Sequence, residues 1–212
     1  EKYGLEDNIF WEDILSNDVD VQARTMFRIS EGVTKAVDDA IWNVLTEDRA
    51  FPSAAAPSTN SILIAATKHW NGTSAAIIND LMNAKQLIAE DNYDTSNLMV
   101  FVSPKDHRSI VQWLASKGTQ FPTIGQEMAQ NGRAGKLVGI DIVISNSVTA
   151  SYALVVVPKI CATWRALTPL TTETITDPLK SVKIRAVEIG VTQLTDPSAV
   201  CIISNTQGNG SE

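Results

Sequence analysis

LMVFVSPKDHRSIVQWL, residues 98–114, is the stretch of sequence that decides the fold. Its first five residues are all apolar, a run typical of a buried strand. Ser103 can cap a following helix, with Pro104 at the first helical position and Asp106 in the first turn. These signals predict a helix over 105–116. A buried strand that passes directly into a capped helix is typical of an α/β unit.

The α/β character continues on both sides of this stretch. A helix is expected before it, over 74–91, with the Thr73–Ser74 pair offering the cap. Two β-branched strands are expected after it, over 137–145 and 152–158. Residues 119–136 contain three glycines and little periodicity, which predicts a long loop that is functional or mobile.

A second pattern, upstream, predicts a helix of unusual length over 18–47. Its apolar residues recur at alternating spacings of three and four, as on one face of a helix. That face comprises Met26, Ile29, Val33, Val37, Ala40, Ile41 and Val44. The helix would be about 45 Å long, well beyond the usual range of about 8–20 residues. Gly32 is its one weak point.

Two long alternating segments later in the chain predict an extended β-hairpin. They span 163–175 and 181–194, and Asp177–Pro178 is the expected turn between them. Residues 195–197 then break the second strand, and a final strand is expected over 199–203.

The remaining segments lack a clear periodicity. Residues 51–61 carry two prolines and three consecutive alanines, which predicts an extended linker. Residues 1–15 are acidic with an apolar cluster, and we interpret them as a tether that docks on another surface. The polar tail from Asn205 is expected to fray. The predicted architecture is α+β, and because neither the long helix nor the hairpin can bury itself alone, both need partners.

The charge distribution excludes several classes of protein. The formal charge is −7 over 212 residues, and residues 1–50, with 12 acidic and 5 basic residues, account for all of it. No basic patch typical of a strongly basic nucleic-acid-binding protein is visible. The hydrophobic fraction of 44% argues against disorder, and no apolar run approaches the ~20 residues of a membrane helix. Charged residues make up only 19%, which suggests that neighbours cover much of the surface.

A search for reaction chemistry finds no catalytic, cofactor-binding or metal-ligating residues. His69 and His107 have no partners at catalytic or metal-ligand spacing, and Cys161 and Cys201 read as buried hydrophobic residues. The glycines of 132–136 lack the strand–loop–helix context of a phosphate site. We interpret the acidic cluster Glu90, Asp91 and Asp94 as a solvated helix end rather than a cation site.

Four stretches in this order resemble the major capsid protein of tailed bacteriophages and related viruses, the HK-ninety-seven-like fold. They are LMVFVSPKDHRSIVQWL (98–114), LVGIDIVISNSV (137–148), YALVVV (152–157) and VKIRAVEIGVTQLTDPSAVCIIS (182–204). In that family a strand leads to a Ser-Pro helix start, as at Ser103-Pro104. The chain later returns through an Arg-containing strand to a Pro-x-Ala strand, here at Arg185 and Pro197.

The resemblance implies a division into domains. A peripheral domain with a long spine helix and a long hairpin would comprise 18–60 and 161–196. An inserted axial domain would comprise 61–160 and 197–205, with the loop 119–136 near a capsomer symmetry axis. Residues 1–17 would be a tether and 206–212 a flexible tail. The family's N-terminal arm and extended loop would be missing or reduced.

The resemblance also implies a function. Copies of the chain would self-assemble into an icosahedral shell around double-stranded DNA, in a virion assembled in the host cytoplasm. Portal, scaffold and decoration proteins are possible partners, whereas an enzymatic activity, a cofactor and a membrane are not expected. Two alternatives stay open: an encapsulin-type compartment enclosing a cargo enzyme, and a small α/β enzyme or ligand-binding domain.

Charged residues on the long helix, the hairpin, the tether and the loop are the expected subunit-interface positions. We expect the acidic ones to face a neighbouring subunit or the outside, because like charges would repel packaged DNA. The candidates are Glu6, Asp7, Glu12, Asp13, Arg24, Arg28, Lys35, Arg133, Lys136, Lys183 and Arg185. Some family members cross-link subunits through a Lys–Asn bond assisted by a Glu. Lys180 and Val187 stand where that Asn and Glu would be, so no cross-link is expected there.

Overall fold

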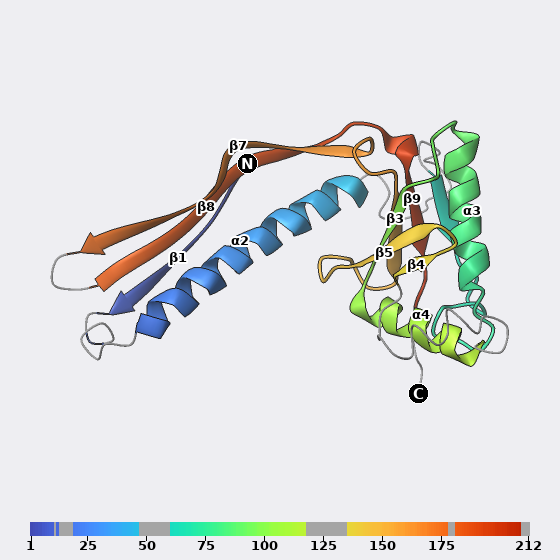
Figure 1. Cartoon of the computed structure of the whole chain (residues 1–212), viewed down its shortest axis with the longest axis horizontal. Coiled ribbons are helices and arrows are strands. Elements are labelled where there is room, and N and C mark those ends of the chain that lie inside the picture. Colours follow the sequence, from blue (N-terminus) through green and yellow to red (C-terminus); the bar gives the residue numbers. More distant parts are fainter. Residues whose placement is uncertain (11, 13–18, 47–59, 118–134, 178–180, 209–212) are drawn as a thin grey trace. The chain divides into compact units, whose positions relative to one another are not determined.

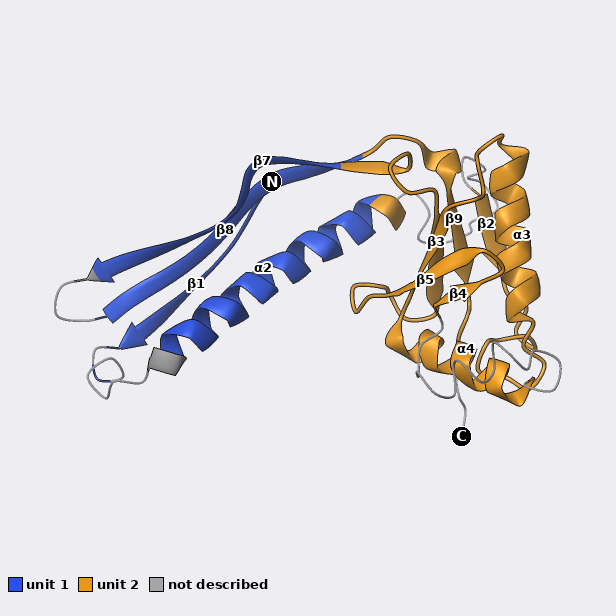
Figure 2. Ribbon diagram, in the orientation of Figure 1, with its two compact units in different colours: residues 1–44, 164–193 blue, residues 45–163, 194–212 orange. Residues whose placement is uncertain are grey.

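The computed structural model describes residues 1–10, 12, 19–46, 60–117, 135–177 and 181–208 (Figure 1). The chain forms two compact units (Figure 2). Unit 1 comprises residues 1–44 and 164–193, and unit 2 comprises residues 45–163 and 194–212. Within the described ranges, no helix has the length and apolar character to cross a membrane.

Unit 1 is a three-stranded sheet packed on one long helix. The helix α2 spans Val19–Thr46, within one residue of the prediction at each end. The predicted hairpin is confirmed as β7, Ala162–Asp177, and β8, Ser181–Leu194. The helix stripe Ile29, Val33 and Val37 is buried as predicted.

The third strand of this sheet corrects the prediction of a tether. Residues Lys2–Phe10 form β1, which pairs antiparallel with β8 so that β8 lies in the middle of the sheet. The segment was misread because its alternation is hidden by charges, and only Ile9 is fully buried. Leu5 lies against Gly32 of α2, where an added Cβ would be 2.5 Å from the leucine Cδ1. The apparent weak point of the helix is therefore the place where β1 packs.

The core of unit 1 is small. One cluster of buried side chains comprises Ile9, Ile29, Val33, Ile184 and Ala186, contributed by β1, α2 and β8. Tyr3, Val21 and Met26 pack against them as partly buried neighbours. Because the core draws on both ends of the sequence, the unit can form only when β1, α2 and β8 come together.

Gly190 allows an aromatic ring to lie flat on β8. The Trp164 ring covers it, donates from Nε1 to Oε1 of Glu188 at 3.2 Å, and has its centroid 6.2 Å from that of Tyr3. A Cβ at position 190 would lie 2.3 Å from Cζ2 of Trp164. No rotation of a rigid indole ring that keeps this packing removes such an overlap.

We therefore expect Gly190→Ala to lower the free energy of unfolding by about 1–3 kcal/mol, the usual cost of overpacking. Urea unfolding of the two proteins measures the difference. Gly4→Ala is the matched control, since its Cβ would meet its neighbours at an ordinary 3.4 Å. Equal stability of the Gly190 and Gly4 variants would contradict the packing argument.

Unit 2 is built on a six-stranded sheet of order β2-β9-β6-β3-β5-β4. The strands are β2 Asn60–Leu63, β3 Leu98–Val102, β4 Lys136–Leu137, β5 Ile140–Ile144, β6 Tyr152–Val156 and β9 Val200–Ser204. The strand predicted over 137–145 is interrupted, because Val138 and Gly139 adopt positive φ values of 55° and 82° and turn the chain between β4 and β5. The last strand, β9, pairs parallel with β2 and antiparallel with β6, so it lies inside the sheet.

Two helices pack on this sheet. Helix α4, Pro104–Ser116, begins as predicted: Ser103 Oγ accepts from the Asp106 amide at 3.1 Å, and Pro104 is its first residue. Helix α3, Ile77–Glu90, begins later than the predicted residue 74, and no side chain caps it. Residues 72–75 are held in a turn instead, with the Ala75 carbonyl accepting from Nε1 of Trp113 at 2.9 Å.

The start of the expected flexible tail is wrong. Thr206 and Gln207 are buried, and Gln207 Nε2 donates to Oδ1 of Asp106 at 2.5 Å. Asp106 also accepts from Ser103 Oγ at 2.7 Å, so a buried carboxylate on α4 holds the chain after β9. The polar composition of this segment predicted solvent exposure, but Gln207 is buried and binds the carboxylate of Asp106 instead of water.

Several predictions fall on parts of the chain that the structure leaves undescribed. They are the linker up to residue 59, the loop up to residue 134, the Ser16 and Asn17 region before α2, and the turn residue Pro178.

Candidate subunit interface

Three of the eleven candidate interface residues lie together on the sheet face of unit 1 that points away from α2. Arg185 donates from Nε and Nη2 to Oε2 of Glu6, at 3.0 and 2.7 Å. Lys183 Nζ lies 3.7 Å from Oε1 of the same carboxylate. The register explains this cluster, because Glu6 pairs with Arg185, and Lys183 lies two residues away on the same face of β8. The side chains stay about two-fifths exposed, so they remain accessible to another subunit.

The cations Arg185 and Lys183 lower the pKa of Glu6. The hydrogen bond from Arg185, followed by the charge of Arg185, lowers the pKa of Glu6 from its ordinary value of 4.5. A carboxyl group with a lowered pKa in the folded state stabilises the fold above its unfolded pKa. That stabilisation disappears as pH falls through the folded value.

We expect Glu6→Gln to lower the melting temperature slightly at pH 7, because exposed ion pairs contribute little. The difference from the original chain should begin to shrink below pH 4.5 and should vanish once pH has fallen through the lowered folded pKa of Glu6. Melting curves at pH 7 and pH 3 measure it, and Asp7→Asn is the charge-matched control on the same strand. A difference that persists unchanged at pH 3 would show that the pair does not act through its charge.

The remaining candidates are spread over the molecule. Arg24, Arg28 and Lys35 are exposed on α2, on the same face as Phe27, which is 73% exposed. Lys136 lies 3.5 Å from Asp141 in unit 2. Asp7 and Glu12 are exposed, whereas Asp13 and Arg133 fall outside the described residues.

The adjacent acids Asp38 and Asp39 of α2 have a third acidic neighbour, Glu188, in the folded unit 1. Burial, followed by the charges of Asp39 and Glu188, raises the pKa of Asp38. Asp38 and Asp39 are adjacent on α2, whereas Glu188 lies on β8, so only the folded unit brings Glu188 near them.

The outer strand β7 exposes apolar side chains. Leu167 is 82% exposed, and Leu170 and Ile175 are 38% and 40% exposed. β7 has one strand neighbour, β8, within the described part of its sheet. A long edge strand with exposed apolar residues is a surface suited to another chain.

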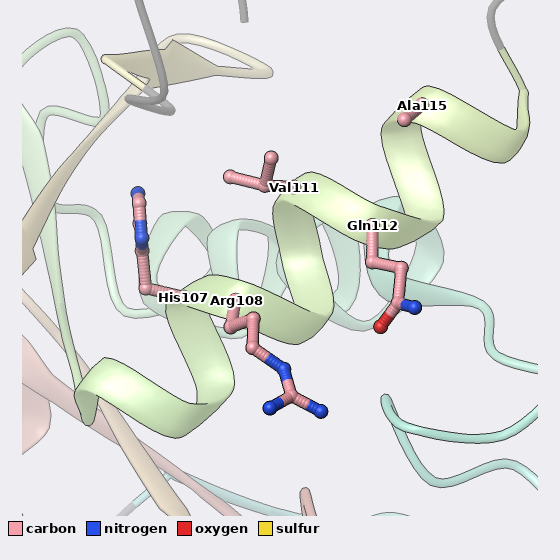
Figure 3. A pocket seen from close by; sticks show the side chains of 5 residues that line it. All are labelled: His107, Arg108, Val111, Gln112 and Ala115. Atoms are coloured by element: carbon pink, nitrogen blue, oxygen red, sulfur yellow. The ribbon is translucent and has the colours of Figure 1, made fainter. Parts of the chain in front are cut away.

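Unit 2 has a groove along the outer face of α4 (Figure 3). His107, Arg108, Val111, Gln112 and Ala115 line it, and its volume is about 390 Å³. His107 is half-buried, not simply solvated as a surface histidine would be. Aliphatic side chains flanked by polar ones make this groove suited to contact with another protein surface.

The described residues contain no group of three or more His, Cys, Asp or Glu that could hold a metal ion. Cys161 and Cys201 are buried and unbonded to each other, as their sequence context predicted. The described residues do offer surfaces suited to binding, at the ion cluster, the β7 edge and the α4 groove.

Comparison with known proteins gives one family and many structures. A family model described as phage capsid protein matches residues 1–203. The capsid of cyanophage P-SCSP1u is similar over 96% of this chain and 72% of its own, with TM-score 0.70 and 15% identity. Mycobacterium phage Che8 is similar over 97% and 71%, with TM-score 0.67 and 17% identity.

The holo-SrpI encapsulin complex from Synechococcus elongatus is also similar. The match covers all of this chain and 76% of the encapsulin chain, with TM-score 0.59 and 10% identity. No curated protein sequence matches the chain. At these identities the structural likenesses establish the fold, and the family model carries the assignment.

Proposed function

Since the chain belongs to the phage capsid protein family, we propose that many copies of it assemble into an icosahedral shell that encloses double-stranded DNA. Its role is that of a structural component of a capsid shell. The observation that carries the proposal is the family match over residues 1–203, which takes in both compact units.

The units fit the two domains of such a subunit. Unit 1, with its long helix and three-stranded sheet, would be the peripheral domain, and unit 2 the axial domain, with 119–136 near the capsomer axis. Shell contacts would close by heterologous packing of one copy on the next. The ion cluster Glu6–Lys183–Arg185, the α2 face with Arg24, Arg28 and Lys35, and Lys136 remain the proposed contact positions.

Further parts of the proposal concern partners and place. The mature particle would be a virion, assembled in the host cytoplasm, with portal, scaffold and decoration proteins as possible partners. The protein would act without catalysis. The exposed acids Asp7 and Glu12 would face a neighbouring subunit or the outside, since packaged DNA would repel them.

Electron microscopy of the expressed chain tests the proposal. Discrete rings or closed shells are the expected result, and the protein should run as large particles in size-exclusion chromatography. A chain that stays monomeric at high concentration, also with any natural upstream sequence restored, would contradict it.

The encapsulin-like alternative rests on the likeness to the Synechococcus encapsulin. Nuclease treatment of particles purified from the native source separates the two. Protected double-stranded DNA supports the viral shell, whereas a copurifying cargo enzyme without DNA supports the compartment.

We also expect no Lys–Asn cross-link at the last strands. By the resemblance to the family, Val187 would stand where the assisting Glu is, and a valine side chain can neither accept nor donate a proton. Denaturing gels of intact particles should show this protein as a single band at the mass of one subunit. A ladder of covalent multimers would refute this expectation.

A further inference from the structure

Two helix ends of unit 2 carry charges of the wrong sign for their own helix. Helix α3 ends with Glu90, Asp91 follows as its C-cap, and no basic residue lies in its last turn. Near the other end of the unit, α4 carries Lys105 at its second position and Arg108 one turn later. A helix favours cations at its C-terminus and anions at its N-terminus, so both arrangements oppose the helix dipole.

These charges are not neutralised within the described part of the chain. Glu90, Asp91 and Asp94, the acidic end, are exposed and accept hydrogen bonds only from neutral groups there. The donors are Gln86 to Glu90, Asn60 to Asp91, and the amide and hydroxyl of Ser96 to Asp94. Lys105 and Arg108 are exposed, and none of the ion pairs of the described residues involves them.

The only acid of α4, Asp106, does not lie on the exposed face that carries the cations. It is fully buried, and Ser103 and Gln207 occupy its two oxygens. The outer face of the helix is therefore basic, and it borders the groove lined by His107, Arg108, Val111, Gln112 and Ala115 (Figure 3). We call this groove, together with Lys105, the basic groove.

The acidic end and the basic groove lie at opposite ends of β9. Asn60 Nδ2 donates both to Asp91 Oδ2 and to the carbonyl of Ser198, which places the acidic end beside the start of β9. Gln207, just after β9, binds Asp106 of α4. Five residues of strand separate the two by about 16 Å, and Figure 1 shows α4 and the end of α3 at opposite ends of this unit.

From this arrangement we infer that the acidic end of one copy docks at the basic groove of the next copy. A single unit carries both complementary surfaces at opposite ends, which is the requirement for a head-to-tail contact that repeats and closes into a ring. At each contact the acids at the end of α3, which its helix dipole disfavours, would lie beside the cations near the start of α4, which their own helix dipole disfavours. The inference rests on the proposed shell function, because it needs copies side by side.

Two reversed-charge variants of the full chain test it. The groove variant carries Lys105→Glu with Arg108→Glu, and the end variant carries Glu90→Lys with Asp91→Lys. Either variant alone places like charges against each other at every contact. It should therefore form rings or shells only at about tenfold or more the protein concentration that the original chain needs. Mixed one to one they become complementary, and only alternating rings with an even number of subunits should form.

Light scattering against protein concentration and electron microscopy of ring sizes provide the readouts. Lys68→Glu with Lys159→Glu is the control, because it changes the net charge as much as the groove variant at exposed sites of unit 2 outside the groove. Melting curves report folding, and the end variant should melt no lower than the original chain because its new lysines suit a helix C-terminus.

The outcomes separate the inference from the function on which it rests. Variants that assemble like the original chain, or variants that fail and are not restored by mixing, would overturn the inference and leave the shell function standing. Failure of the original chain to assemble would overturn both. Loss in each variant with restoration in the mixture would establish the contact.

Discussion

Trp70→Ala is expected to lower the free energy of unfolding by about 3–5 kcal/mol, the usual cost of removing a buried aromatic side chain. Trp70 is 1% exposed, and it is among the largest fully buried side chains of the described residues. Its Nε1 donates to Oδ2 of Asp80 at 3.0 Å, and its backbone amide donates to the Thr206 carbonyl at 2.8 Å. The residue therefore joins α3 to the chain that follows β9.

Removing the indole also affects Asp80. Burial raises the pKa of this carboxyl group, while the hydrogen bond from Trp70 and the charge of Lys68 lower it. Without the indole donor the pKa should rise further. A raised pKa destabilises the ionised form in the fold, so the penalty of the variant should increase as pH rises through the folded pKa of Asp80, which lies above 3.8.

Trp70→Phe is the matched control for this prediction. It keeps most of the buried ring but lacks the donor, so it should lose only about 1 kcal/mol, the typical worth of one hydrogen bond. Urea unfolding at pH 3.5 and pH 7 measures both variants. If Trp70→Ala lost less free energy of unfolding than Trp70→Phe, the indole would have no packing role.

Ile184→Ala is the second change with a large expected effect, about 2–5 kcal/mol. Ile184 is 2% exposed in the middle strand of unit 1 and belongs to the buried cluster of Ile9, Ile29, Val33, Ile184 and Ala186. A core this small has few neighbours that could move to fill the cavity. We expect the loss to fall on unit 1, and with it the ability to form shells.

Ile175→Ala is the control, because it removes the same atoms from the same sheet at a side chain that is 40% exposed. Its effect should stay within about 0.5 kcal/mol. Urea unfolding gives the stabilities and microscopy the assembly. Equal losses for the two isoleucines would show that the buried cluster is not what stabilises unit 1.

Sequence patterns predicted elements whose signals are local. The apolar run at 98–102 and the Ser103-Pro104 start gave β3 and α4, because a buried strand and a helix cap depend on adjacent residues. The long helix and the hairpin were predicted for the same reason, since each has many regular repeats.

The failures involve partners that are distant in sequence. Strand β1 is defined by pairing with residues 181–189, and Gln207 by the carboxylate of Asp106, 101 residues away. Glu6 and Arg185 were both predicted as interface residues, but their contact within one chain follows only from the register of β1 and β8. The acidic end was noticed in the sequence, yet its possible partner at α4 emerges only from the positions of both on one sheet.

The position of β9 has a consequence for protein synthesis. Residues 200–204 lie between β2 and β6, so residues 60–156 lack a central strand of their sheet until the ribosome has reached this segment. In unit 1, β8 likewise separates β1 from β7, and it too is synthesised late. A nascent chain that stops before residue 200 therefore has neither a complete sheet in unit 2 nor the anchor at Asp106. We therefore expect a chain truncated before β9 to be degraded rather than to fold, because its unit 2 sheet lacks an inner strand.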